Sequence, residues 1–145
     1  MTQSKAIETT RLILRVHCTE DFDDMYAMWS DPVVTRYIGG KTFSREDVWG
    51  RLLRYAGTWA LLGYGFWVIR DKQSGDFVGE VGFHNLHREI VPPFGDRPEL
   101  GFGLIPRAHG KGFAIEAARA ALDWGESGWG EREMVCMIAP AVDGG

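Results

Sequence analysis

The sequence predicts an α/β fold in which a mixed, mostly antiparallel central sheet is flanked by helices. Short apolar runs of strand character alternate with segments whose apolar residues recur at helical spacing, in the order β-α-α-β-β-β-α-β. Residues 66–70 and 77–83 have the pattern of strands joined by a hairpin turn at 72–75, so the middle of the sheet is expected to be antiparallel. A chain of 145 residues, of which 45% are hydrophobic, fits one ordinary domain, predicted over 1–145.

Helix start and stop signals place the remaining elements. Thr19, followed by acidic residues, begins a helix that ends at the Asp-Pro pair 31–32, because proline disfavours a further turn. Ser44 and Asp47 form the N-cap pattern of a second helix, which runs to about Leu62. The other predicted elements are strands at 11–15, 100–104 and 134–139, and a helix at 112–124 that is ended by the glycines at 128 and 130.

Composition and charge exclude several classes of partner. The net charge of −4 argues against general nucleic-acid binding, which needs a basic surface to neutralise phosphates. No stretch approaches the roughly 20 apolar residues of a membrane span, and the start of the chain has no secretory signal, so no membrane partner is expected. Cys18 and Cys136 form no Cys-x-x-Cys pair, which fits reduced thiols in the cytoplasm. His84 and His87 lack further ligands at suitable spacing, so no metal site is predicted.

The segment 99–118 combines a strand, a turn rich in glycine and basic residues, and the start of an alanine-rich helix. The first amides of a helix lack intrahelical partners and lie at the positive end of its dipole. Gly110 and Gly112 remove the side chains that would block an anion, and Arg107 and Lys111 add positive charge. The turn is therefore a candidate cradle for a pyrophosphate. It matches neither the P-loop pattern nor the G-x-G-x-x-G dinucleotide fingerprint.

What remains is the pattern R-x-x-G-x-G from Arg107 to Gly112, placed after a strand and at the opening of a helix. In this position it resembles the coenzyme A signature of the GNAT superfamily of N-acetyltransferases, and the predicted order of elements matches that family. The resemblance covers about residues 7–139 and leaves 140–145 as a tail. Three short segments resemble the subgroup typified by ribosomal-protein N-terminal acetyltransferases. They are Thr-Arg-Leu-Ile-Leu-Arg at 10–15, Trp-Ser-Asp-Pro at 29–32 and Glu-Leu-Gly-Phe at 99–102.

The resemblance implies acetyl-CoA as co-substrate, with its pyrophosphate on backbone amides of the turn and its pantetheine arm along the strand edge before the turn. A strand amide there would polarise the thioester carbonyl. The residues implied for the turn are Arg107, His109, Gly110, Lys111, Gly112, Phe113 and Ala114, and those implied for the strand are Phe102, Gly103, Leu104 and Ile105. Independently of the family, Glu99, Gly101 and Gly103 share one strand face, and the two glycines are expected to leave room for a ligand beside the carboxylate.

Acetyl transfer to an amine needs a base, because the amine arrives protonated. Glu99 is the favoured candidate, and Glu80, which shares a strand face with Gly82 and His84, is the second. The resemblance supports this assignment, since the family uses a strand carboxylate, often through a water molecule. For each carboxylate the alternative is a solvated or paired residue at a strand end.

The expected reaction is direct transfer, in which the amine and acetyl-CoA bind together and no covalent enzyme intermediate forms. The first two helices and the loop at 31–43 would wall the acceptor pocket, where Arg36 and Tyr37 contact a protein N-terminus or a small-molecule amine. The alternative for the aromatic residues of these helices is a role in the core alone.

The family continues after its fifth strand with a helix and two more strands, and that helix usually supplies the group that protonates the leaving thiolate. This sequence ends in small residues at 141–145, so the last helix and two strands are expected to be missing. The fifth strand would then be an open edge, which a homodimer could cover. Two alternatives to an active enzyme stay open: a non-catalytic CoA-binding or regulatory domain, and a folding-deficient fragment that dimerises.

Overall fold

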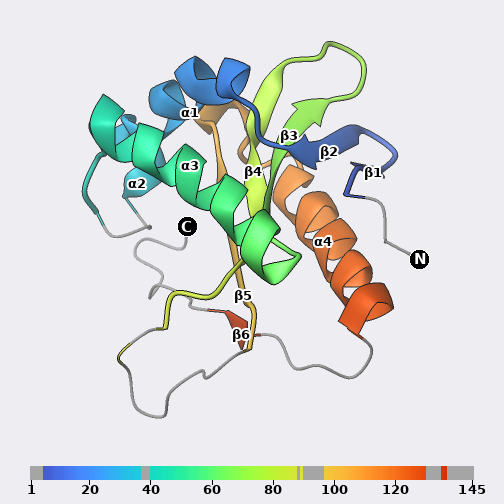
Figure 1. Ribbon diagram of the computed structural model, residues 1–145. Helices are drawn as coiled ribbons and strands as arrows, with labels where there is room; N and C mark the ends of the chain where they lie inside the picture. Colours follow the sequence, from blue (N-terminus) through green and yellow to red (C-terminus); the bar gives the residue numbers. More distant parts are fainter. Residues whose placement is uncertain (1–4, 37–39, 88, 90–96, 130–134, 137–145) are drawn as a thin grey trace.

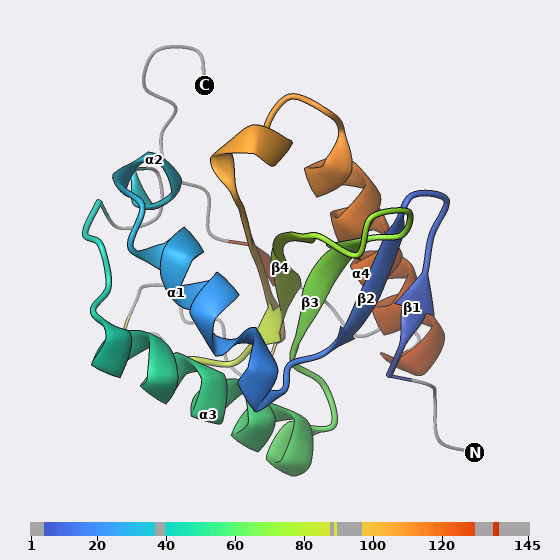
Figure 2. The same cartoon turned by 90° about the horizontal axis from the view of Figure 1, so that it is seen from above.

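The computed structural model describes residues 5–36, 40–87, 89, 97–129 and 135–136. They form three layers, with a six-stranded sheet between helices (Figures 1 and 2). The helices of the first half of the chain cover one face of the sheet, and the helix that follows the glycine-rich turn covers the other. The predicted fold class, a mixed and mostly antiparallel sheet flanked by helices, is confirmed.

The strands follow one another across the sheet in chain order. Adjacent strands are antiparallel except for the last pair, β5 and β6, which is parallel, as a crossover through a helix requires. The strands are β1 (Ile7–Glu8), β2 (Leu12–Val16), β3 (Phe66–Asp71), β4 (Phe77–His84), β5 (Glu99–Leu104) and β6 (Val135–Cys136).

The helices begin and end where capping chemistry places them. The longest of them starts with the predicted capping box: Ser44 Oγ accepts a hydrogen bond from the Asp47 amide at 3.1 Å, and the Ser44 amide donates to Asp47 Oδ2 at 3.0 Å. Gly63, at φ +76°, ends this helix. The α-helices are α1 (Phe22–Trp29), α2 (Pro32–Thr35), α3 (Arg45–Leu62) and α4 (Phe113–Trp129), with single 3-10 turns at Thr19–Asp21 and Pro106–Ala108.

Each face of the sheet has its own core, because side chains alternate along every strand. On β4, Val81 and Phe83 face α4, whereas Glu80, Gly82 and His84 face α1 and α3. The α4 side is apolar and includes Trp67, Ile69, Val81, Phe83, Leu104, Ala117 and Ala121. The other side includes Met25, Met28, Trp29, Leu52, Tyr55 and Phe66.

Three elements differ from the sequence prediction. The strand β1 and the helix α2 have two and four residues, too few to produce a periodic pattern. The helix α4 continues past 124, because Gly125 is buried on the same face as Ala117 and Ala121, where a small residue allows close packing on the sheet. Of the strand predicted at 134–139, the structure describes 135–136, and the rest lies outside the described residues.

Candidate active site

The turn between β5 and α4 presents backbone amides that no described protein group engages. Gly110 and Gly112 have φ of +75° and +77°, in the left-handed region that favours glycine. The first hydrogen bond of α4 with i→i−4 spacing runs from the Glu116 amide to the Gly112 carbonyl at 3.1 Å. Within the described part of the chain, the amides of Gly110, Lys111 and Gly112 have no protein acceptor. Together with the helix dipole behind them, these amides can bind an anion.

The space in front of the turn is open. A Cβ added to Gly110 would meet no atom within 4 Å. The side chains of Arg107 and Lys111 are exposed beside this space, and His109 Nε2 lies 3.0 Å from the Leu104 carbonyl, which ties the turn to the end of β5. The other predicted coenzyme contacts of the turn, Phe113 and Ala114, form the first turn of α4.

Arg11 holds the turn in place from the opposite end of the sequence. Its guanidinium donates to the Lys111 carbonyl at 2.9 Å and to Glu116 Oε1 at 2.7 Å, and it stacks over the Phe113 ring at 4.4 Å. Thr9 Oγ1 donates to the other oxygen of Glu116 at 2.6 Å. Burial opposes ionisation of Glu116, but the bonds from Thr9 and Arg11 prevail and lower its pKa. The sequence analysis assigned no role to Arg11.

Among the described residues, the outer edge of β5 next to the turn has backbone amides that no other strand pairs. The Ile105 amide donates to the Val78 carbonyl at 3.0 Å, so Ile105 faces β4. Along an antiparallel pair, successive residues direct their backbone N–H and C=O groups to opposite edges of the strand. The backbone groups of Gly103 therefore also point toward β4, whereas those of Phe102 and Leu104 point toward the other edge. Among the described residues, β6 pairs only with the first two residues of β5. Of the four predicted strand contacts, Phe102 and Leu104 therefore lie where a ligand can reach their amides.

Glu99 lies at the start of β5, directly opposite His84 on β4. Its Oε1 is 3.5 Å from His84 Nε2, and the two side chains are 4% and 13% exposed. The register pairs Glu99 with His84 and so places it on the same face of the sheet as Glu80. Glu99 is thus a largely buried carboxylate with a histidine neighbour.

The strand glycines do not leave the room that we expected beside Glu99. A Cβ on Gly103 would lie 3.0 Å from the Trp29 ring, and a Cβ on Gly101 would lie 3.1 Å from the Phe66 ring. Aromatic rings from α1 and β3 therefore fill the space over these glycines. The expectation of a ligand there was wrong, because sequence parity shows which residues share a face but not what covers it.

Glu80 is fully buried and hydrogen-bonded at both carboxylate oxygens. The Trp29 indole and the Tyr55 hydroxyl donate to Oε1 at 2.8 and 2.6 Å, and His17 Nε2 lies 2.8 Å from Oε2. Burial raises the pKa of Glu80, but the bond and charge of His17 and the charge of Arg51 outweigh it and bring the pKa below its usual value. This geometry favours the alternative interpretation of Glu80, a paired carboxylate rather than a base.

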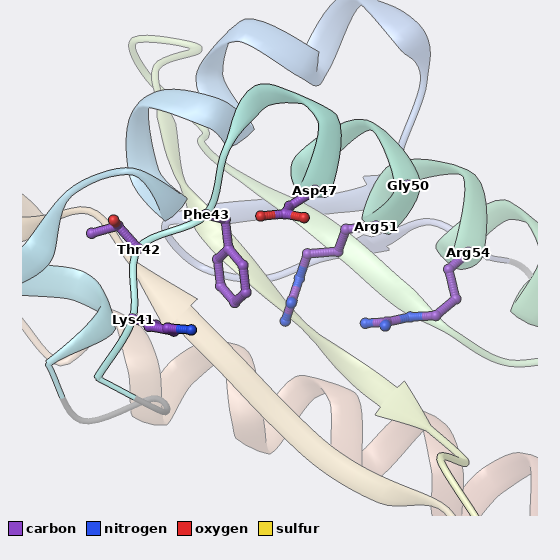
Figure 3. A pocket seen from close by; sticks show the side chains of 7 residues that line it. All are labelled: Lys41, Thr42, Phe43, Asp47, Gly50, Arg51 and Arg54. Atoms are coloured by element: carbon purple, nitrogen blue, oxygen red, sulfur yellow. The ribbon is translucent and has the colours of Figure 1, made fainter.

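Two cavities lie on the α1–α3 side. One, of about 300 Å³, adjoins the predicted coenzyme contacts Ile105 and Arg107. The other, of about 360 Å³, lies between the first half of α3 and the segment before it (Figure 3). The second is lined by Lys41, Thr42, Phe43, Asp47, Gly50, Arg51 and Arg54.

The predicted acceptor contacts do not coincide with these cavities. Arg36 follows α2, is exposed, and lines neither cavity, and Tyr37 lies outside the described residues. The sequence analysis missed Arg51 and Arg54. Arg51 falls at helical spacing between the buried Val48 and Tyr55, and an arginine on the buried face of a helix is the signal that could have identified it.

In the described part of the chain, no group of three or more His, Cys, Asp or Glu side chains is arranged to hold a metal ion. None of the helices described is long and apolar enough to cross a membrane. Cys18 is a free, exposed thiol, and the side chain of Cys136 is not described.

Comparison with known proteins agrees with the strand–turn–helix geometry. Residues 11–141 match the family model described as "Acetyltransferase (GNAT) domain". The chain is 30% identical over 125 residues to the "Uncharacterized N-acetyltransferase YoaA" of Bacillus subtilis (strain 168), covering 86% of this chain and 68% of that relative. A solved structure from Bordetella pertussis, assigned to the GnaT acetyltransferase family, superposes with a TM-score of 0.79 at 28% identity, covering 92% of this chain and 78% of the other.

A more distant structure, spermidine N-acetyltransferase from Vibrio cholerae in complex with CoA and spermine, shares the fold. It superposes with a TM-score of 0.62 at 20% identity, and the match covers 82% of this chain and 66% of the spermidine N-acetyltransferase chain. The sheet, the crossover helix and the open turn define an acyltransferase domain of the CoA-dependent type. The chain belongs to the GNAT acetyltransferase family.

Proposed function

We propose that the chain transfers an acetyl group from acetyl-CoA to a primary amine by direct attack in a ternary complex. The observation that carries this proposal is the turn with two left-handed glycines and amides that lack protein acceptors, at the opening of a 17-residue helix. In this arrangement the amides of 110–112 and the first turn of α4 hold the pyrophosphate. The outward backbone groups of Phe102 and Leu104 hold the pantetheine arm, and one strand amide polarises the thioester carbonyl.

Glu99 is the proposed base. Both candidates lie on one face of the sheet, but the oxygens of Glu80 are already engaged by Trp29, Tyr55 and His17. Glu99 has a slightly exposed carboxylate next to His84. It can take a proton from the incoming amine directly or through water.

The acceptor is a protein N-terminus or a small-molecule amine. The phrases at 10–15, 29–32 and 99–102 resemble ribosomal-protein N-terminal acetyltransferases and support the first choice. The named activity of the Vibrio cholerae structure, spermidine N-acetylation, supports the second as an option within this fold.

Calorimetric titration with CoA tests the cradle. Gly110→Glu places a carboxylate in the open space before the amides, and we expect the Kd for CoA to rise by about tenfold or more. Gly75→Glu is a matched control, because Gly75 has φ +78°, is also open within 4 Å, and lies in the β3–β4 turn. Both variants carry the same backbone strain and charge, so equal CoA binding by the two would contradict the proposed site.

A thiol-release assay over a panel of amines tests the reaction. Glu99→Gln should lower kcat about 100-fold while leaving the Kd for CoA unchanged, because a general base contributes to the proton transfer and not to coenzyme binding. Glu126→Gln, an exposed carboxylate on α4, is the control. CoA binding without thiol release from any amine would instead support a non-catalytic CoA-binding domain.

A further inference from the structure

Around the 360 Å³ cavity beside α3, the described cationic side chains outnumber the described carboxylates. Lys41, Arg51 and Arg54 line it, and their side chains point toward a common space (Figure 3). Its one lining carboxylate, Asp47, is engaged in capping α3 through the Ser44 amide. Three cations and one committed carboxylate leave the cavity with a net positive charge.

Arg51 is a fixed cation at the bottom of this cavity. Its Nε donates to the Tyr55 hydroxyl at 2.7 Å and lies 3.8 Å from Glu80 Oε1. Its guanidinium stacks over the Trp29 ring at 4.2 Å and near the Phe43 ring at 5.2 Å. Within the described residues, its two terminal nitrogens have no hydrogen-bond acceptor. The head group is therefore oriented with both terminal nitrogens, and their four N–H donors, unused.

Arg54 lies one turn further along α3 and adds a second cation at close range. Among the described residues it has no ion-pair partner, and its one aromatic contact is with Tyr55 at 6.0 Å. Partial burial lowers the pKa of Arg54, and the charge of Arg51 lowers it further. Glu80 balances part of the charge of Arg51, but the two guanidinium groups still repel each other. An anion between them would relieve that repulsion.

The cavity is separated from the proposed transfer strand by one aromatic ring. Arg51 stacks on one part of the Trp29 indole, and the edge of the same indole contacts Gly103 of β5. A group held by Arg51 and Arg54 would thus be anchored on the same side of the sheet as Glu99, close to the strand whose edge we assign to the thioester.

We propose that this cavity binds a carboxylate of the acceptor, so that the preferred substrate is an amine that also carries a carboxylate group. This inference rests on the proposed acetyl transfer. The carboxylate can belong to a free amino acid or to an acidic side chain close to a peptide N-terminus. A polyamine, which carries only positive charge, is disfavoured by the same three cations.

Two matched pairs of acceptors test the inference and distinguish the two sources. Serine and serinamide differ in the α-carboxylate, and seryl-glutamate amide and seryl-glutamine amide differ in a side-chain carboxylate. In the thiol-release assay we expect the KM of the carboxylate member to be about tenfold lower in at least one pair. The pair that shows the difference identifies the source.

Arg54→Gln should raise the KM for that carboxylate acceptor about tenfold and leave the KM for its amide partner unchanged. Arg119→Gln, an exposed arginine on α4 outside the cavity, should change neither. Arg54 is preferable to Arg51 as the test position, because Arg51 also contacts Tyr55 and Glu80 in the core. Spermidine is included as a cationic acceptor and should have the highest KM.

Calorimetric titration of the same four compounds into the CoA-loaded chain gives a readout that does not need turnover. Tighter binding of the carboxylate member, lost in Arg54→Gln, supports the inference even if no amine is acetylated, which would count against the proposed function alone. Equal KM and equal Kd within both pairs would overturn the inference. A preference for spermidine would also overturn it. So would an Arg54→Gln variant that binds both members of a pair equally more weakly.

Discussion

Glycines are used in two opposite ways in this molecule. In the strands β4 and β5 they are enclosed: a Cβ on Gly82 would collide with the backbone of Gly65 and Phe66, and Gly103 lies under the Trp29 ring. In the turn before α4, Gly110 has a positive φ and open space in front of it. The enclosed glycines serve packing, and the open one leaves the approach to the backbone free for a ligand. Changes at the first should cost stability, and changes at the second should cost binding.

Among the variants that test this comparison, Gly82→Ala is expected to cause the largest loss of stability. The new Cβ would lie against backbone atoms, which cannot rotate away, so the free energy of unfolding should fall by about 3 kcal/mol or more. Gly57→Ala is the control, because Gly57 lies in α3 with no atom within 4 Å of an added Cβ. There alanine should stabilise by about 0.5–1 kcal/mol through helix propensity. Urea unfolding measures the free energy of unfolding of both variants. A Gly82→Ala protein as stable as the wild type would refute the interpretation that Gly82 is enclosed by backbone.

Glu80→Gln should cost about 3 kcal/mol, because it removes the charge that balances Arg51 and disturbs the contact with His17 in a buried site. Its pH dependence is a sharper test. The pKa of Glu80 in the folded chain lies below its ordinary value of 4.5, so its stabilisation is present above pH 4.5 and is lost as the pH falls. The difference in unfolding free energy between wild type and variant should be equal at pH 7 and pH 5 and should shrink at pH 4 and pH 3. A gap that stays constant at acidic pH would show that Glu80 contributes no ionic stabilisation.

Arg11→Gln should have a small effect on stability and a larger one on the turn. Its ion pair with Glu116 is partly exposed, so the loss of stability should be below about 1 kcal/mol. Without the bond to the Lys111 carbonyl the turn is less well held, and the Kd for CoA should rise about threefold to tenfold. Arg45→Gln removes a comparable pair, an ion pair to Asp23 and a stack over the Phe22 ring, at a site away from the turn. If both variants weaken CoA binding equally, the turn does not depend on Arg11.

Most of the fold could be predicted from the sequence because its signals are local. The capping box at Ser44 and the apolar stripe of α3 are contained within one helix, and the β3–β4 hairpin depends on its turn residues. The end of α4 was predicted too early, at about 124, because the packing of Gly125 against the sheet depends on strands far away in the chain.

The candidate site was predictable to a different degree. The turn was located correctly as a strand–turn–helix junction, since R-x-x-G-x-G is a continuous pattern. Arg11 and Arg51 were not found, because each owes its position to groups from another element: Lys111 and Glu116 for Arg11, and the Trp29 ring of α1 for Arg51. The interpretation of Gly103 failed for the same reason, because the ring that covers it comes from residue 29.

The link between Arg11 and Glu116 spans 105 positions, so the proposed coenzyme cradle joins two segments that lie far apart in the sequence. During synthesis the proposed cradle therefore stays incomplete until the first turn of α4 has left the ribosome, and acetyl-CoA bound there would not assist earlier stages of folding. Before that stage the nascent sheet must gain its order from its own hairpins.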